Sequence, residues 1–180
     1  MSGGWRGIVA QGAPRIKEAL GTRAGGPYAG GMEGEMDRRN DEGSAALMAG
    51  SFLRLVGRAL AAEVNAKALY EAGFCLLAHD GAADPRFIYA NRAAQTCFGY
   101  SWDEFIGLPS RLSAEAPERA ERDRLLAAVR EHGFIADYRG VRVRKNGERF
   151  WIEQAVVWEL RDAAGVRRGQ AAVFAPPATP

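Results

Sequence analysis

Apolar residues recur every three or four positions after residue 45, a spacing that is typical of a helix with one buried face. The members of this stripe are Met48, Phe52, Leu55, Val56 and Leu60. We therefore predict an amphipathic helix over 45–63. The segment before it, 1–44, is rich in glycine and weakly patterned. It cannot bury enough apolar surface to offset the entropy of ordering, so we predict that it is disordered.

Short apolar runs at 74–79 and 87–90 flank the turn sequence DGAADP and predict a pair of strands. Asn91 follows directly and is placed to cap a short helix. Ser101 and Glu104 form a capping-box pattern, in which each residue can satisfy a free backbone N–H of the other. A second short helix is therefore predicted to begin at Ser101.

The C-terminal part of the chain predicts one longer helix and three strands. The helix begins near Pro117, because proline is favoured in a first turn, and ends at Gly133. Asn146-Gly147 lies between two alternating runs, which is a strong signal for a hairpin. The tail at 176–180 is expected to be flexible. The strands are predicted at 134–145, 148–160 and 169–174.

Strict alternation along 150–160 separates two faces of one strand. The first face is Phe150, Ile152, Gln154, Val156, Trp158 and Leu160. A buried amide without a partner costs about 1–3 kcal/mol, so Gln154 needs a bound ligand, a neighbouring side chain or a water. The other face is half apolar through Trp151 and Val157. The helix at 45–63 is its expected cover, from the same chain or from a second copy.

In the preceding strand the alternation slips. Phe134 and Tyr138 share one parity, whereas Val141 and Val143 share the other. Either a β-bulge near 139–140, where glycine suits the bulge position, or a simple edge irregularity accounts for the slip.

The composition is that of an ordinary soluble globular domain of 180 residues, 47% hydrophobic and 26% charged. The 24 basic and 22 acidic residues nearly cancel, so the net charge of +2 gives no support for nucleic-acid binding. There is no signal-peptide pattern and no apolar stretch of about 18 residues, so we expect a cytoplasmic protein without a membrane partner. Cys75 and Cys97 lie in apolar surroundings without a CxxC pair, which favours buried thiols over a zinc site.

Four blocks of the sequence stand out: RFIYANRAA at 86–94, SWDEFIGLPSRLSAE at 101–115, GFIADYRGVRV at 133–143 and GQAAVF at 169–174. In this order they resemble the MEKHLA domain, a PAS-related family, and the chain is identified as a stand-alone bacterial type. The resemblance implies an α+β fold of the PAS type. This fold has a five-stranded antiparallel sheet with helices on one face, here over 64–175 and preceded by the amphipathic helix.

PAS relatives include the light-oxygen-voltage (LOV) photoreceptors, which hold a flavin beside a reactive cysteine and two asparagines. The resemblance puts Ser110 in the cysteine's place and Arg142 and Ile152 in the asparagines' places. A hydroxyl is a far poorer nucleophile than a thiol, so adduct photochemistry is not expected. Haem usually needs an axial histidine, and both His79 and His132 are interpreted as structural or solvent-facing. No cofactor is predicted; a flavin or haem sensor without LOV photochemistry stays an alternative.

These features favour a sensory or regulatory module and predict no enzyme, because no histidine has a motif-like relation to Ser110. We expect the module to bind a small ligand or a partner protein and to pass the event through its N-terminal helix. The alternative is a ligand-free module for homodimerisation or protein interaction. Arg111 is a candidate because a guanidinium beside a cavity can pair with a carboxylate; a surface salt bridge is the competing interpretation. The candidate ligand-binding residues are Asn91, Ser110, Arg111 and Gln154.

Overall fold

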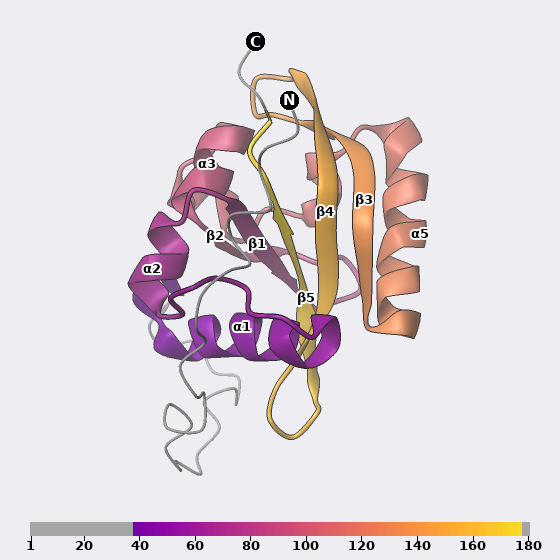
Figure 1. Cartoon of the computed structure of the whole chain (residues 1–180). Coiled ribbons are helices and arrows are strands. Elements are labelled where there is room, and N and C mark those ends of the chain that lie inside the picture. Colours follow the sequence, from indigo (N-terminus) through magenta and orange to yellow (C-terminus); the bar gives the residue numbers. More distant parts are fainter. Residues whose placement is uncertain (1–37, 178–180) are drawn as a thin grey trace, which may run out of the picture.

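Five strands of the described chain pair into one antiparallel sheet in the order β2-β1-β5-β4-β3 (Figure 1). The structure is a computed structural model and describes residues 38–177. The strands are β1 Cys75–Asp80, β2 Phe87–Ala90, β3 Phe134–Val143, β4 Arg149–Arg161 and β5 Arg167–Phe174. The helices are α1 Glu42–Val56, α2 Ala66–Glu71, α3 Arg92–Phe98, α4 Trp102–Phe105 and α5 Ala116–His132, with 3-10 turns η3 Arg38–Asn40 and η4 Ser110–Ser113. The predicted five-stranded antiparallel sheet is confirmed.

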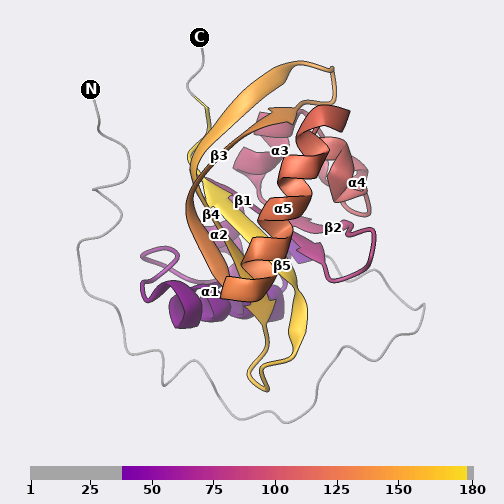
Figure 2. The same ribbon diagram turned by 90° about the vertical axis from the view of Figure 1, so that its right-hand side faces the viewer.

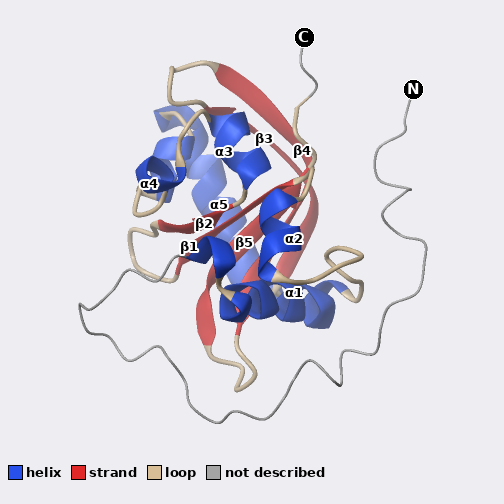
Figure 3. Cartoon of the chain, turned by 90° about the vertical axis from the view of Figure 1, so that its left-hand side faces the viewer, coloured by secondary structure: helices blue, strands red, loops and turns tan. Residues whose placement is uncertain are grey.

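Helices cover both faces of this sheet, and α2 packs on the same side as α1, whereas the sequence predicts helices on one face for the domain at 64–175. Figure 3 shows α1 and α2 in front of the strands with α5 behind, and Figure 2 shows α5 lying across that second face. The alternation of β1 assigns its side chains accordingly. Leu76 and Ala78 join the apolar cluster under α1, whereas Cys75 joins the cluster under α3 and α4. The two faces of the sheet therefore contribute to separate apolar clusters, and a third cluster of Leu125, Val129 and Val157 lies between α5 and β4.

Helix α1 is held by its caps and by its inner face. The Asp41 carboxylate accepts hydrogen bonds from the first free N–H groups, and Gly57 ends the helix in the left-handed conformation at φ 79°. The helix is therefore Glu42–Val56, shorter at its C-terminal end than the predicted 45–63. On the inner face Phe52 packs edge-on against Trp158 with ring centroids 4.8 Å apart. Burying such an aromatic side chain stabilises the fold by roughly 1.5–3 kcal/mol.

A serine ties α1 to the end of β4. The fully buried Ser51 hydroxyl donates to the Arg161 carbonyl oxygen at 2.7 Å and accepts from the Arg161 N–H at 2.9 Å. This one side chain satisfies both backbone groups of a residue more than a hundred positions away. The helix is thus fixed to the sheet by polar as well as apolar contacts.

Gln154 forms a bulge in β4 that exchanges the two faces of the strand. Its φ is 51°, a left-handed value that a regular strand does not contain. Phe150 and Ile152 accordingly join the cluster under α3, whereas Trp158 packs under α1. The predicted single face from Phe150 to Leu160 is wrong, because the alternation restarts at the bulge. Trp151 stays half-exposed rather than covered by α1.

A second bulge, at Asp137 in β3, compensates for the first. Asp137 has φ 56°, and the pairing shifts between Ile135 and Tyr138 and again between Tyr138 and Gly140. The predicted irregularity near 139–140 is confirmed, although its extra residue lies on β4. Phe134 pairs with Trp158 at one end, and the hairpin end keeps the same register.

The predicted disordered segment 1–44 lies mostly outside the described residues, as does most of the tail at 176–180. Within the segment 1–44, the described residues form η3 and the first turn of α1.

Candidate functional site

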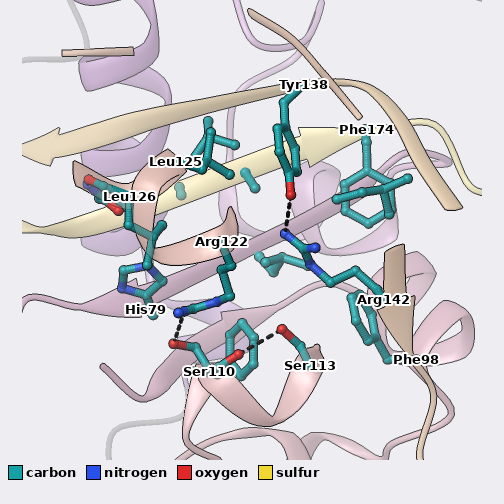
Figure 4. A pocket seen from close by; sticks show the side chains of 17 residues that line it. His79, Phe98, Ser110, Ser113, Arg122, Leu125, Leu126, Tyr138, Arg142 and Phe174 are labelled. Carbon is teal, nitrogen blue, oxygen red and sulfur yellow. Dashed lines mark hydrogen bonds between the residues drawn. The ribbon is translucent and has the colours of Figure 1, made fainter. Parts of the chain in front are cut away.

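A cavity of about 50 Å³ lies between the second face of the sheet, η4 and α5 (Figure 4). Its walls are largely apolar, but a group of polar side chains enters it from β1, η4, α5, β3 and β5. This polar group is His79, Ser110, Ser113, Arg122, Tyr138, Arg142 and Gln170. The site therefore combines an apolar wall with a few convergent polar groups, which is the usual composition of a small-molecule site.

Arg122 reaches the cavity from the first half of α5. It is 5% exposed, and its Nη2 donates to the Ser110 hydroxyl. Its Nη1 lies 3.3 Å from a carboxylate oxygen of Asp123, whose side chain is 71% exposed. Burial lowers the pKa of the Arg122 guanidinium, and the positive charge of Arg142 lowers it further. A buried cation and a second cation nearby thus face the same space.

Arg142 enters from β3 and is 7% exposed. It donates to the Val141 carbonyl oxygen at 2.7 Å and to the Tyr138 hydroxyl at 3.2 Å. Gly140 makes this meeting possible, because a Cβ there would lie 2.2 Å from the Tyr138 hydroxyl oxygen. The missing side chain at Gly140 leaves room for the tyrosine and the guanidinium on the cavity wall.

Backbone contacts of the loop before η4 fix the position of Ser110. Its N–H and its hydroxyl both donate to the Pro85 carbonyl oxygen, at 2.8 and 2.9 Å, which ties η4 to the turn before β2. The Ser113 hydroxyl in turn donates to the Ser110 carbonyl oxygen at 2.7 Å. Ser110 is fully buried, and its oxygen also receives the Arg122 donor. It is therefore a rigid acceptor at the floor of the cavity.

His79 places an unpaired acceptor in the cavity wall. Its Nδ1 lies 2.7 Å from the Asp80 carbonyl oxygen, so the proton of the neutral ring sits on Nδ1 and Nε2 carries a lone pair. Nε2 is buried and has no partner among the described residues. Burial lowers the pKa of His79 to about 4. The ring is therefore neutral at physiological pH.

Beyond His79 lies a buried carboxylate, Glu159, whose negative charge is already balanced by Arg167. Glu159 is fully buried and accepts from Arg167 Nε at 2.8 Å and from Gln170 Nε2 at 2.6 Å. The same Gln170 amide donates to the Leu126 carbonyl oxygen of α5 at 3.0 Å, so it joins the helix to the sheet. Gln170 Oε1 has no partner among the described residues.

The four candidate residues from the sequence lie in different places. Ser110 lines the cavity, whereas Arg111 is exposed and pairs with Asp84 at 3.1 Å. Gln154 is exposed on its bulge and is not buried in an apolar row. Asn91 is fully buried, and its amide is occupied by backbone groups. Asn91 Oδ1 accepts from the N–H groups of Leu76 and Ala94, and its Nδ2 donates to the carbonyls of Leu69, Ala72 and Phe74.

Sequence reasoning missed the two cavity arginines as ligand-binding candidates. Arg122 precedes Leu125 and Val129 by three and seven positions, so it falls on the apolar stripe of α5. A charged residue at an apolar position of the helical pattern is therefore the sequence signal that marks Arg122. The resemblance to LOV domains puts Arg142 and Ile152 at flavin-contacting positions, and both line the cavity.

The cavity does not fit a flavin. Its volume of about 50 Å³ is well below the roughly 300–1,000 Å³ of typical small-molecule sites. Arg142 and Tyr138 fill the space beside Ile152, and Ser110 has no thiol. His79 lies in the wall of the same small cavity, which has no room for a haem, and His132 is 60% exposed and does not line this cavity.

Comparison with known proteins agrees with this geometry. The family model of the MEKHLA domain matches residues 43–176, which is most of the chain. The chain belongs to the MEKHLA domain family. The match begins within the first turn of α1, so this helix lies inside the matched region. A search of curated proteins found no match.

Solved structures similar to this MEKHLA protein include PAS and light-oxygen-voltage domains. A PAS domain from Colwellia psychrerythraea is 20% identical, with a TM-score of 0.54 over 60% of this chain and 89% of that one. A light-oxygen-voltage domain studied with a flavin analogue is 23% identical, with a TM-score of 0.53 over 63% and 84%. An RNA-binding light-oxygen-voltage receptor is 26% identical, with a TM-score of 0.52 over 59% of this chain and 30% of that one. The fold is that of PAS and LOV domains. Among the described residues, no helix has the length and apolar character needed to cross a membrane.

Proposed function

We propose that this MEKHLA protein is a sensor module whose cavity binds a small ligand and whose helix α1 passes the event on. The observation that carries the proposal is the group of buried polar atoms in the cavity. Arg122, Arg142 and His79 line the cavity and can contact a ligand there. The acceptor atom Nε2 of His79 has no hydrogen-bond partner among the described residues. Leaving such a group unpaired costs about 1–3 kcal/mol, which a bound ligand would recover.

The sheet supports the proposed route from the cavity to α1. Val157 of β4 lines the cavity, and its neighbour Trp158 contacts Phe52 of α1 on the other face. The hydrogen bonds between Ser51 and Arg161 join the same helix to the same strand. A ligand that moves β4 therefore changes the surface on which α1 lies.

Two readouts on the full chain test this proposal with a panel of small neutral, anionic and cationic organic compounds. NMR signals of the Ile152 and Val157 methyl groups report occupancy of the cavity, and hydrogen exchange of α1 amides reports transmission. We expect a compound that shifts the methyl signals also to change α1 exchange. The Ser51→Ala variant should keep the methyl shifts and lose most of the response of α1. If no compound shifts the methyl signals, the ligand proposal is wrong.

A partner protein or a second copy is the other candidate, and Trp151 favours it. This side chain is 50% exposed on β4, next to the edge strand β3, with the Arg139 guanidinium 4.1 Å from its ring centroid. Aromatic and arginine side chains are enriched at protein interfaces. Light scattering on the full chain and on Trp151→Ser tests this: a dimer that the substitution dissociates supports it, and a monomer at all concentrations contradicts a homodimer.

We further propose that the module acts without catalysis. Ser110 is the most buried hydroxyl of the site, but its oxygen is engaged by Pro85 and Arg122 rather than by a histidine base. A serine nucleophile needs such a base within hydrogen-bond reach. Turnover of a generic ester substrate that is lost in Ser110→Ala would contradict this proposal.

A cytoplasmic location is proposed on the two thiols. Cys75 and Cys97 are buried and free, as small core thiols are in reducing compartments. Fractionation of the native source with detection of the full chain tests this location; recovery outside the cytoplasm would refute it.

A further inference from the structure

The cavity contains two cations that no buried carboxylate neutralises. Arg122 has the exposed Asp123 as its ion-pair partner, and water screens that pair. Arg142 donates to a carbonyl and a phenol, and it forms no ion pair among the described residues. Glu159 is the buried carboxylate of the neighbouring wall, but Arg167 already occupies it. The site therefore has an excess of positive charge.

Buried charges in proteins are usually paired, because removing an ion from water carries a large cost. The two guanidinium groups enter the cavity from different sides, Arg122 from α5 and Arg142 from β3 (Figure 4). A guanidinium presents several N–H donors in one plane, an arrangement that matches a carboxylate. An anion between Arg122 and Arg142 would supply the missing charge.

His79 adds a second requirement. Its Nε2 is an acceptor beside Arg122 in the cavity wall. A hydrogen-bond acceptor needs a donor, which a carboxylate cannot supply. Because the ring is neutral at physiological pH, it supplies no further positive charge. A hydroxyl next to the carboxylate would satisfy it.

Size and the apolar walls limit the rest of the ligand. One water needs about 10–15 Å³ of cavity volume, so a cavity of about 50 Å³ suits only a few heavy atoms. Leu125, Ile152 and Val157 form an apolar side to this space. Inorganic phosphate would leave that side without a contact, whereas a short alkyl group would cover it.

We propose that the cavity binds a short-chain hydroxycarboxylate, with Arg122 and Arg142 donating to the carboxylate and His79 Nε2 accepting from the hydroxyl. This inference rests on the proposed function, namely that the cavity is the ligand site. It adds the chemical class of the ligand and the role of each polar residue.

The test compares three compounds of similar size on the full chain: lactate, propionate without the hydroxyl, and lactamide without the charge. Sodium chloride keeps the ionic strength equal in all titrations. Binding is measured by calorimetry and by the methyl signals of Ile152 and Val157. We expect lactate to bind about tenfold more tightly than either analogue, because each analogue loses one hydrogen-bonded group.

Substitutions then assign the contacts. Arg142→Gln and Arg122→Gln should each weaken lactate binding about tenfold or more and abolish the preference for lactate over lactamide. Arg111→Gln is the matched control, because this neighbouring arginine is exposed and pairs with Asp84; it should leave all three affinities unchanged. If Arg122→Gln does not fold, Arg122→Lys retains the charge and Arg142→Gln carries the test.

The outcomes separate the two proposals. Equal binding of lactamide and lactate overturns the carboxylate assignment while leaving the cavity a ligand site, and equal binding of propionate and lactate overturns the role of His79. Preferred binding that survives both arginine substitutions also overturns the assignment. If none of these compounds and none of the wider panel shifts the methyl signals, the proposed function fails together with the inference.

Discussion

Acidification should destabilise this domain through His79. The pKa of the buried ring is about 4, whereas the ordinary value is 6.5. Burial is the main cause, and the positive charges of Arg122 and Arg167 add to it. The Asp80 carbonyl and carboxylate act in the opposite direction. In the unfolded chain the ring takes up its proton near pH 6.5, but in the folded chain it does so only near pH 4.

The size of this effect follows from the difference between the two pKa values. Below pH 6.5 the unfolded chain binds more protons than the folded chain, so stability falls as the pH falls, by up to about 1.4 kcal/mol per pH unit. Across the window from 6.5 to about 4 the loss reaches about 3 kcal/mol and then levels off. Above pH 6.5 the ring is neutral in both states and contributes no pH dependence.

Urea unfolding of the wild type and of His79→Asn, at several pH values from about 7.5 to 4.5, measures the effect. Asparagine keeps a donor for the Asp80 carbonyl but does not titrate. Taking the difference in free energy of unfolding between the two proteins at each pH cancels the contribution of acidic groups such as Glu104. His132→Asn is the control, because His132 is exposed, and it should follow the wild type. If the free energies of unfolding of the wild type and His79→Asn fell in parallel with pH, the ring would not be buried in its neutral form.

Three further perturbations test other parts of the fold. Asn91→Ala should lower the free energy of unfolding by about 2–4 kcal/mol, measured with urea, because it removes the α3 cap and leaves buried backbone groups unpaired; a loss below about 1 kcal/mol would contradict this. Gly169→Ala should cost about 3 kcal/mol or more, since its Cβ would lie 2.0 Å from the His79 carbonyl oxygen, while Gly73→Ala, with open space around it, should change little. Cys75 should resist a disulfide reagent until the protein unfolds, because its hydrogen bond with Cys97 and its burial raise the pKa of the thiol; rapid reaction of the native protein would refute this.

Local signals in the sequence placed most elements correctly. Asn91 caps α3, and the reciprocal contacts of Ser101 and Glu104 open α4, as their spacing predicts. Gly133 ends α5 as expected. These features involve residues within a few positions of one another, so a single segment contains the whole signal.

Features that depend on pairing between distant segments could not be predicted in the same way. Nothing near Gln154 marks it as a bulge, because the extra residue is defined only against its partner strand β3. The same applies to Arg122 and Arg142, which α5 and β3 bring to one cavity. Neither segment contains a sequence signal that the other lies beside it. Ser110 was found because a family resemblance supplied the missing spatial information.

The compensating bulges at Asp137 and Gln154 make the lengths of β3 and β4 interdependent. Removing either residue alone would leave one end of the hairpin out of step by one position. Removing both would restore a regular ladder, with Tyr138 and Arg142 still on the cavity face and Trp158 still under α1. Single-residue deletions at these two positions should therefore behave genetically as mutual suppressors. Sequence alignments in this region are expected to carry gaps in pairs, one on each side of the hairpin.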